Sequence, residues 1–76
     1  MNPANVKKQR NKIGGYLKST RTQKGLSMYL VAQRAGMKIG QIKAMEEGNT
    51  SYTIDSLLKV LSALETTTTA LGQIID

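Results

Sequence analysis

Apolar residues recur at helical spacing through the middle of the chain, from Leu26 to Gly48. They fall into two short helical patterns, over about 28–35 and 39–46, and share one face. These residues are Leu26, Val31, Ala32, Ala35, Met37, Ile42 and Met45. Two helices that meet across a tight turn with a glycine, here Gly36, form a helix-turn-helix unit, whose second helix can enter the major groove of DNA. The pattern therefore predicts this unit within a small DNA-binding domain.

Further helical patterns flank this unit on both sides. Upstream, Ile13, Tyr16 and Leu17 place one apolar stripe on a helix from about residue 12 to 23. Downstream, Thr53 is a good N-cap for a helix over 54–64, where apolar residues repeat every three or four positions. They are Ile54, Leu57, Leu58, Leu61 and Leu64, with Val60 beside them. The sequence thus predicts an all-α fold, a compact bundle of four or five helices.

The two ends of the chain carry weaker patterns. Residues 2–12 hold few apolar groups among four basic ones, so we expect an N-terminal arm that is loosely helical at best. In the tail, four consecutive threonines favour extended chain, whereas Leu71, Ile74 and Ile75 have the spacing of a short fifth helix. We therefore divide the chain into a basic arm (1–12), a helix-turn-helix domain (13–64) and a tail (65–76) used in dimerisation.

Charge is divided unevenly along the chain, whose net charge is +6. Residues 1–45 carry ten of the eleven basic residues and no acidic one, which gives +10. Residues 46–76 carry Lys59 and five acidic residues, which gives −4. A basic region of this kind suits DNA, because neutralising phosphates releases counterions. An anionic membrane could use the same charge, and a solvated basic face that keeps the protein soluble is the plainest interpretation.

Residue types that are missing exclude several kinds of function. The chain has no cysteine and no histidine, so it lacks thiolate and imidazole metal ligands and the usual general base near neutral pH. It also has no glycine-rich phosphate motif, so we expect no enzyme, cofactor, metal or small-molecule ligand. No apolar stretch has the length of a membrane span, and the start of the chain lacks the apolar run of a signal peptide. We expect a cytoplasmic protein.

The order of residues from 13 to 64 resembles the Cro/repressor type of helix-turn-helix domain (the XRE family, lambda repressor-like). The matching elements are Ile13-Gly14, Arg21, the Gly-Leu-Ser at 25–27, Val31-Ala32, Ala35-Gly36, Ile42, Glu46, Gly48, Tyr52-Thr53-Ile54 and LLKVLSAL. The resemblance implies a homodimeric transcriptional regulator that binds a pseudo-palindromic operator in double-stranded DNA. It also implies a structural salt bridge between Arg21 and Glu46.

The same resemblance assigns DNA contacts by position. The base-contacting positions are Lys38, Ile39, Gly40, Gln41, Lys43 and Ala44. The positions that it places at the DNA backbone are Arg21, Ser27, Met28, Asn49 and Thr50. We expect Arg10 and Lys12 of the basic arm to contact the backbone as well. Lys43 can donate to guanine O6/N7, and Gln41 can pair with adenine, so these two residues are the best candidates for sequence preference. We expect the basic arm and the helix N-termini to supply most of the affinity.

The sequence departs from the family where function is concentrated. Met28 stands where many members have a glutamine, and Gly40 offers no side chain for base contact. Leu30 replaces an expected acid, so we expect residues 28–30 to form an exposed apolar patch. This patch is the basis of an alternative function, a protein-interaction module on the same fold, either antitoxin-like or an accessory partner.

Overall fold

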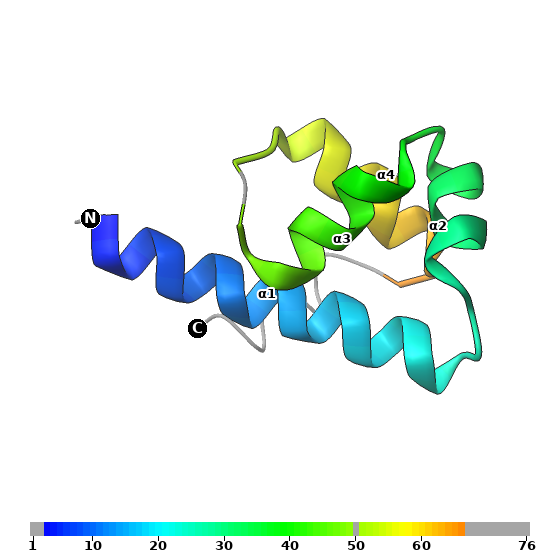
Figure 1. Cartoon of the computed structure of the whole chain (residues 1–76), viewed down its shortest axis with the longest axis horizontal. Helices are drawn as coiled ribbons and strands as arrows, with labels where there is room; N and C mark the ends of the chain where they lie inside the picture. The colour runs from blue at the N-terminus through cyan, green and yellow to red at the C-terminus, as the bar shows by residue number, and fades with distance from the viewer. Residues whose placement is uncertain (1–2, 50, 67–76) are drawn as a thin grey trace.

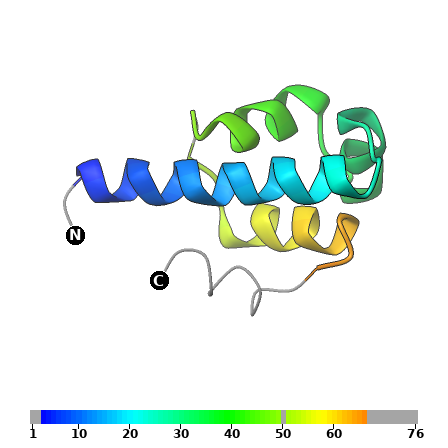
Figure 2. The same cartoon turned by 90° about the horizontal axis from the view of Figure 1, so that it is seen from below.

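The computed structural model describes residues 3–49 and 51–66, and four helices account for most of them (Figure 1). They are α1 (Pro3–Gln23), α2 (Met28–Ala35), α3 (Ile39–Glu47) and α4 (Ile54–Ala63). The long α1 runs along the molecule, with α3 on one side of it and α4 on the other (Figure 2). Helix α3 packs against α1, and α2 packs against both α3 and α4. The predicted all-α bundle is confirmed.

Helix α1 begins much earlier than we expected from the sequence. It starts at Pro3 rather than near residue 12, so the prediction of a loosely helical arm was wrong. Proline is accepted in a first turn, and lysine, glutamine and arginine are good helix formers. Packing adds to this, because Asn11 lies directly against the end of α3: a Cβ on Gly48 would come 3.2 Å from the Asn11 Cα. The basic residues of this segment therefore lie on a helix held by the bundle.

Local capping rules explain the ends of the other helices. Ser27 Oγ accepts a hydrogen bond from the Leu30 amide (3.0 Å), and Thr53 Oγ1 accepts one from the Ser56 amide (3.1 Å). These N-caps satisfy first-turn N–H groups that no helix can satisfy internally. Gly36 closes α2 in the left-handed conformation (φ 68°), which glycine adopts without steric cost. The helix-turn-helix unit forms where the pattern predicted it.

Gly14 sets the distance between α1 and α3. A Cβ at this position would lie 2.6 Å from the carbonyl oxygen of Met45 and 2.8 Å from the carbonyl carbon of Glu46. Both are backbone atoms that cannot turn aside as a side chain can. Glycine is expected at such close approaches of two backbones, even though it weakens a helix interior. The next residue, Gly15, has open space around it, so the two adjacent glycines are not equivalent.

The hydrophobic core draws on all four helices. Its buried members are Leu17, Val31, Ala32, Ala35, Ile42, Met45, Leu57, Val60, Leu61, Ala63 and Leu64. The expected apolar stripe of α4 needs correction, because Ile54 is 67% exposed and Leu58 44% exposed, whereas Val60 is buried. The expected patch over residues 28–30 is also smaller than predicted. Tyr29 is 63% exposed, but Met28 packs against the core and Leu30 is half-buried.

Polar contacts bind the C-terminal end of α4 to the loop that follows α1 and to α2. Lys24 Nζ donates to the carbonyl oxygen of Leu64 (2.5 Å), and Arg34 Nη1 donates to that of Ala63 (3.4 Å). Cations at this end of a helix satisfy carbonyls that have no partner within it and favour the helix dipole. Beyond the helix, the Tyr16 hydroxyl is 2.5 Å from Thr66 Oγ1. The last described residue is therefore held beside α1.

Candidate DNA-binding surface

Helix α3 presents one face to the core and the other to solvent. Ile42, Met45 and Glu46 are buried. The positions predicted to contact bases lie on the outer part of the helix, where all are exposed except Ala44, which is half-buried: Lys38, Ile39, Gly40, Gln41, Lys43 and Ala44. Neither lysine is in an ion pair within residues 3–49 and 51–66. The geometry leaves these groups available to a ligand outside the protein.

Gln41 has a structural role that we did not predict. Its side-chain oxygen Oε1 accepts a hydrogen bond from the backbone N–H of Lys38 at 3.0 Å, and so caps the start of α3. The spacing of three residues is that of the second half of a capping box, a signal that was present in the sequence. A bidentate contact to adenine needs both the carboxamide oxygen and the NH₂ group. The cap leaves the NH₂ group free and occupies one acceptor position of the oxygen.

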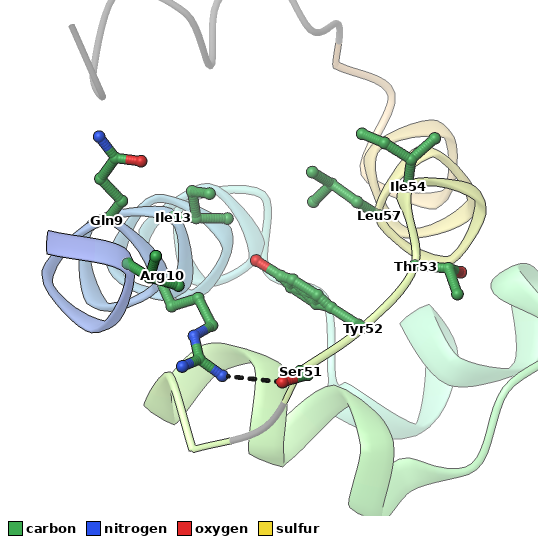
Figure 3. A pocket seen from close by; sticks show the side chains of 9 residues that line it. Gln9, Arg10, Ile13, Ser51, Tyr52, Thr53, Ile54 and Leu57 are labelled. Carbon is green, nitrogen blue, oxygen red and sulfur yellow. Dashed lines mark hydrogen bonds between the residues drawn. The ribbon is translucent and has the colours of Figure 1, made fainter. Parts of the chain in front are cut away.

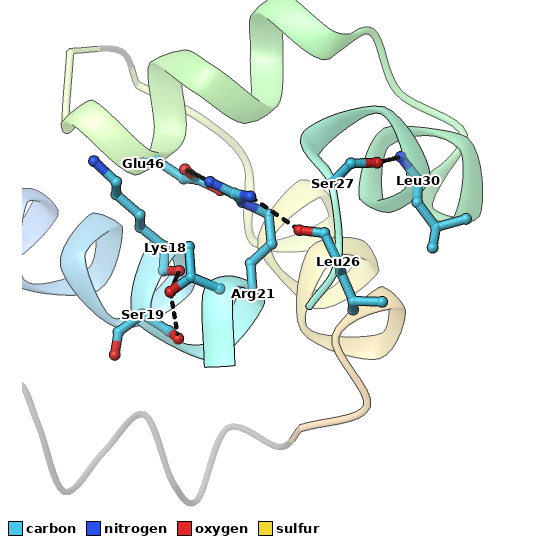
Figure 4. A network of polar contacts seen from close by, with 8 residues as sticks. Lys18, Ser19, Arg21, Leu26, Ser27, Leu30 and Glu46 are labelled. Carbon is cyan, nitrogen blue, oxygen red and sulfur yellow. Dashed lines mark hydrogen bonds and ion pairs between the residues drawn. The ribbon is translucent and has the colours of Figure 1, made fainter. Parts of the chain in front are cut away.

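Arg21 and Glu46 join α1 to α3 beneath this surface (Figure 4). Arg21 Nε donates to Glu46 Oε2 at 2.7 Å, and Nη2 donates to Oε1 at 3.1 Å. The side chains are 11% and 4% exposed. This hydrogen bonding, opposed by burial and aided by the negative charge of Glu46, raises the pKa of Arg21. The paired ions thus hold α3 in a fixed orientation on α1.

Arg21 also fixes the connection between α1 and α2, because its Nη1 donates to the carbonyl oxygen of Leu26 at 2.9 Å. All three guanidinium nitrogens therefore have partners inside the protein. Arg21 thus links α1, α3 and the end of the loop between α1 and α2. These contacts give it a structural role, and its contact with a DNA phosphate stays a prediction.

The remaining backbone-contact positions lie at three places on the molecule. Ser27 and Met28 form the start of α2, where unpaired N–H groups of a first turn suit a phosphate. At the other end of α3, Asn49 Nδ2 donates to Glu47 Oε1 (3.1 Å). Thr50 lies outside the described residues. Lys12 is exposed on α1, which leaves its amine accessible.

Arg10 is held by the loop before α4 (Figure 3). Its Nη1 donates to Ser51 Oγ at 3.2 Å, whereas its buried Nε has no hydrogen-bond partner in the described part of the chain. Nearby, burial raises the pKa of the Tyr52 hydroxyl, and the positive charge of Arg10 opposes this shift. We did not predict this contact, because we expected Arg10 to lie in a loosely helical arm and Ser51 is 41 residues away in the sequence.

Membrane-spanning helices and metal-binding clusters are both absent from the described residues. None of their helices has the length and apolar character needed to cross a membrane. Within residues 3–49 and 51–66, no group of three or more acidic, cysteine or histidine side chains could hold a metal ion.

A family model described as helix-turn-helix matches residues 17–71, and the chain belongs to this family. Among proteins of curated function, no relative of the sequence is found. The restriction-modification controller protein C.AhdI from Aeromonas hydrophila is 29% identical, with a TM-score of 0.77 over 82% of this chain and 94% of that one.

Two further structures share the fold at lower identity. A point mutant of the restriction-modification controller protein C.Esp1396I has a TM-score of 0.81 at 21% identity, over 88% of this chain and 87% of that one. The clp gene regulator ClgR from C. glutamicum has a TM-score of 0.81 at 22% identity, again over 88% and 87%. The fold of this chain is thus that of small helix-turn-helix regulators.

Proposed function

We propose that this protein is a cytoplasmic transcription regulator that binds double-stranded DNA through α3. The observation that carries this proposal is the contrast between the two faces of that helix. The inner face is fixed by the core and by the pair between Arg21 and Glu46. The outer face exposes Lys38 and Lys43 without an acidic partner in the described chain. Membership of the helix-turn-helix family supports the same assignment, as do the regulatory names of the similar structures.

In this proposal α3 lies in the major groove. Lys43 donates to guanine O6 or N7, and the methyl-bearing side chains of Ile39 and Ala44 contact thymine methyl groups. Gln41 keeps its NH₂ group for a base or phosphate while its oxygen caps the helix. The first turn of α2, at Ser27 and Met28, directs N–H groups to a backbone phosphate. Binding needs no catalytic group, which agrees with a protein that is not an enzyme.

The proposed active form is a homodimer on a pseudo-palindromic operator. Its interface consists of the outer edge of α4, where Leu58 is 44% exposed, and it does not require the tail 65–76. Exposed apolar residues on a small helical domain are typical of a surface that pairs with another chain. A twofold dimer would place two copies of α3 about one turn of DNA apart, which is the half-site spacing of such proteins.

Selection of bound sites from a random DNA library tests this function. We expect the wild-type protein to select a common sequence, and Lys43→Ala to relax the preference at one base pair by about 1–3 kcal/mol. Lys59→Ala is the matched control, because it removes an equal charge from an exposed position on α4. It should keep the sequence preference. No selected sequence and no binding at low salt would refute the proposal.

The salt dependence of affinity measures the phosphate contacts separately. Each contact should contribute about −0.9 to the slope of log affinity against log salt concentration. The alternative, a protein-interaction module, has lost much of its basis, because Tyr29 is the one residue of the expected patch 28–30 that is exposed, and Met28 and Leu30 are half-buried. Capture of a protein partner together with a slope near zero would restore it.

A further inference from the structure

A groove of about 290 Å³ lies between the N-terminal part of α1 and the start of α4. Its walls are mainly aliphatic, with Val6 and Ile13 from α1 and Ile54 and Leu57 from α4. Tyr52 lies between the two helices, and Arg10 reaches past it to Ser51 on one side (Figure 3). Helix α1 packs mainly on α3 and makes few direct contacts with α4. The groove is the space that these two helices leave between them.

The walls of this groove keep large apolar side chains accessible. Val6 is 37% exposed and Ile54 is 67% exposed. Single exposed apolar residues are common, but neighbouring ones that line a hollow mark a place where another segment binds. Gln9 and Arg10 are the polar residues that α1 contributes to the lining of the groove. An occupant therefore needs aliphatic side chains on the face that it turns towards the groove.

The described part of the chain ends beside this groove. Thr66 Oγ1 is 2.5 Å from the hydroxyl of Tyr16, and Tyr16 follows Ile13 by three residues, hence on the same side of α1. Lys24 Nζ donates hydrogen bonds to the carbonyl oxygens of Leu64 (2.5 Å) and Glu65 (3.3 Å). These contacts fix the point from which the last ten residues, 67–76, continue.

We propose that residues 67–76 bind in this groove of their own chain, with Leu71, Ile74 and Ile75 against its aliphatic walls. These three residues have the spacing of one helical face. From Tyr16 to Val6, α1 rises about 15 Å. The nine residue steps from Thr66 to Ile75 span about 14 Å as a helix or about 30 Å when extended. The segment can thus follow the groove along most of its length.

The covalent connection and the charges both favour binding of the chain's own segment 67–76 in the groove over binding of the same segment from a second copy. A segment attached through a short linker has an effective concentration on the order of millimolar, far above the micromolar concentrations of a partner chain. The segment ends in Asp76 and has no basic residue, whereas α1 contains no acidic residue. Long-range attraction between the acidic segment and the basic helix therefore supports the same placement.

Disulfide trapping in the full chain tests this proposal. The natural sequence contains no cysteine, so an introduced pair has no competitor. Gln9→Cys combined with Ile74→Cys should oxidise rapidly to a species of monomer mass under non-reducing conditions. Lys7→Cys with Ile74→Cys is the control, because Lys7 is exposed and two residues away, about 200° around α1. Trapping at twice the chain mass, or equal rates for both pairs, would overturn the proposal.

Thermal unfolding of the full chain provides a second measurement. Ile74→Asn should lower Tm by on the order of 5 °C, whereas Gln73→Asn, off the predicted face, should leave it nearly unchanged. The loss should not depend on protein concentration, because the proposed contact is within one chain. An unchanged Tm for Ile74→Asn, or a loss that disappears at high dilution, would contradict the inference. Neither experiment depends on DNA binding, so the two proposals can fail separately.

Discussion

Arg10 and Arg21 lie about three helical turns apart on the same side of α1, yet their surroundings differ. Arg21 donates to both carboxylate oxygens of Glu46 and to a backbone carbonyl. Arg10 donates to one hydroxyl, that of Ser51, and its buried Nε has no partner among the described residues. We expected both arginines to contact DNA phosphates, and the family resemblance also implied the pair between Arg21 and Glu46. The structure shows each arginine bound to another part of the protein, and their contacts with DNA stay predictions.

This difference shows how the partners of an arginine determine its contribution to the free energy of unfolding. A bidentate contact with a carboxylate is strong and fixes orientation. Removing one partner leaves the other ion buried without compensation. A single hydrogen bond to a neutral hydroxyl stabilises by only about 0.5–1.5 kcal/mol, and a buried N–H without a partner has a cost of its own. The C-terminal part of α1 should therefore be held much more firmly than its N-terminal part.

Replacing Arg21 should give the largest effect. Arg21→Met keeps most of the aliphatic stem but leaves Glu46 charged and only 4% exposed, so we expect a loss of about 3–5 kcal/mol in the free energy of unfolding. Glu46→Ala should also lower Tm, because it leaves Arg21 without its carboxylate. Chemical denaturation of purified variants measures both. A loss below 1 kcal/mol for either would show that the pair does not hold α3 on α1.

The two adjacent glycines at the middle of α1 give the next largest contrast. Gly14→Ala forces the helix away from the backbone of α3 and should cost about 1–3 kcal/mol. Gly15→Ala has open space and should stabilise the helix by about 0.5–1 kcal/mol. Opposite shifts of Tm are therefore expected for two identical substitutions at neighbouring positions. Equal effects would mean that α1 and α3 are not in close contact there.

Arg10→Met should have a smaller effect than Arg21→Met, although the substitution is the same. It removes one hydrogen bond to Ser51 and also removes a buried N–H without a partner, so the two contributions partly cancel. We expect the free energy of unfolding to change by less than about 1.5 kcal/mol. A loss in the free energy of unfolding as large as that of Arg21→Met would show that the two ends of α1 are held equally firmly.

The pH dependence near Arg10 should give the smallest effect. Burial raises the pKa of Tyr52 above its ordinary value of 10.0, so the folded protein favours the neutral phenol. This contribution is fully present below pH 10 and is lost as pH rises through the higher pKa of the folded state. Tyr52→Phe should therefore flatten the decline of Tm at alkaline pH. An identical decline in the variant would exclude Tyr52 as its source.

Much of the helix-turn-helix region could be predicted because its determinants are local. Ser27 and Thr53 cap helices by contacts three residues away, and Gly36 makes a turn that few other residues allow. The start of α1 could not be predicted in the same way. Its polar first turns are stabilised by tertiary neighbours such as Gly48 and Ser51, more than 35 residues away in the sequence, and helix stability in proteins depends largely on such packing.

The candidate DNA-binding face shows a similar division. Helical periodicity was enough to separate the buried Ile42 and Met45 from the outward-facing Lys43. It did not reveal that Gln41 caps its own helix, although the three-residue spacing contained that signal. Periodicity also failed to separate Leu58 from Val60 on α4, because both are apolar and the position of α2, which packs on α4, determines which side is covered.

By itself, the sequence determined the class of fold, the helix-turn-helix unit and the concentration of positive charge in the first 45 residues. These follow from periodicity, capping and composition, which act over a few residues. The tertiary structure decided the length of α1, the internal binding of Arg10, and the groove between α1 and α4. Each of these depends on segments far apart in the chain, whose contacts arise only when the helices pack.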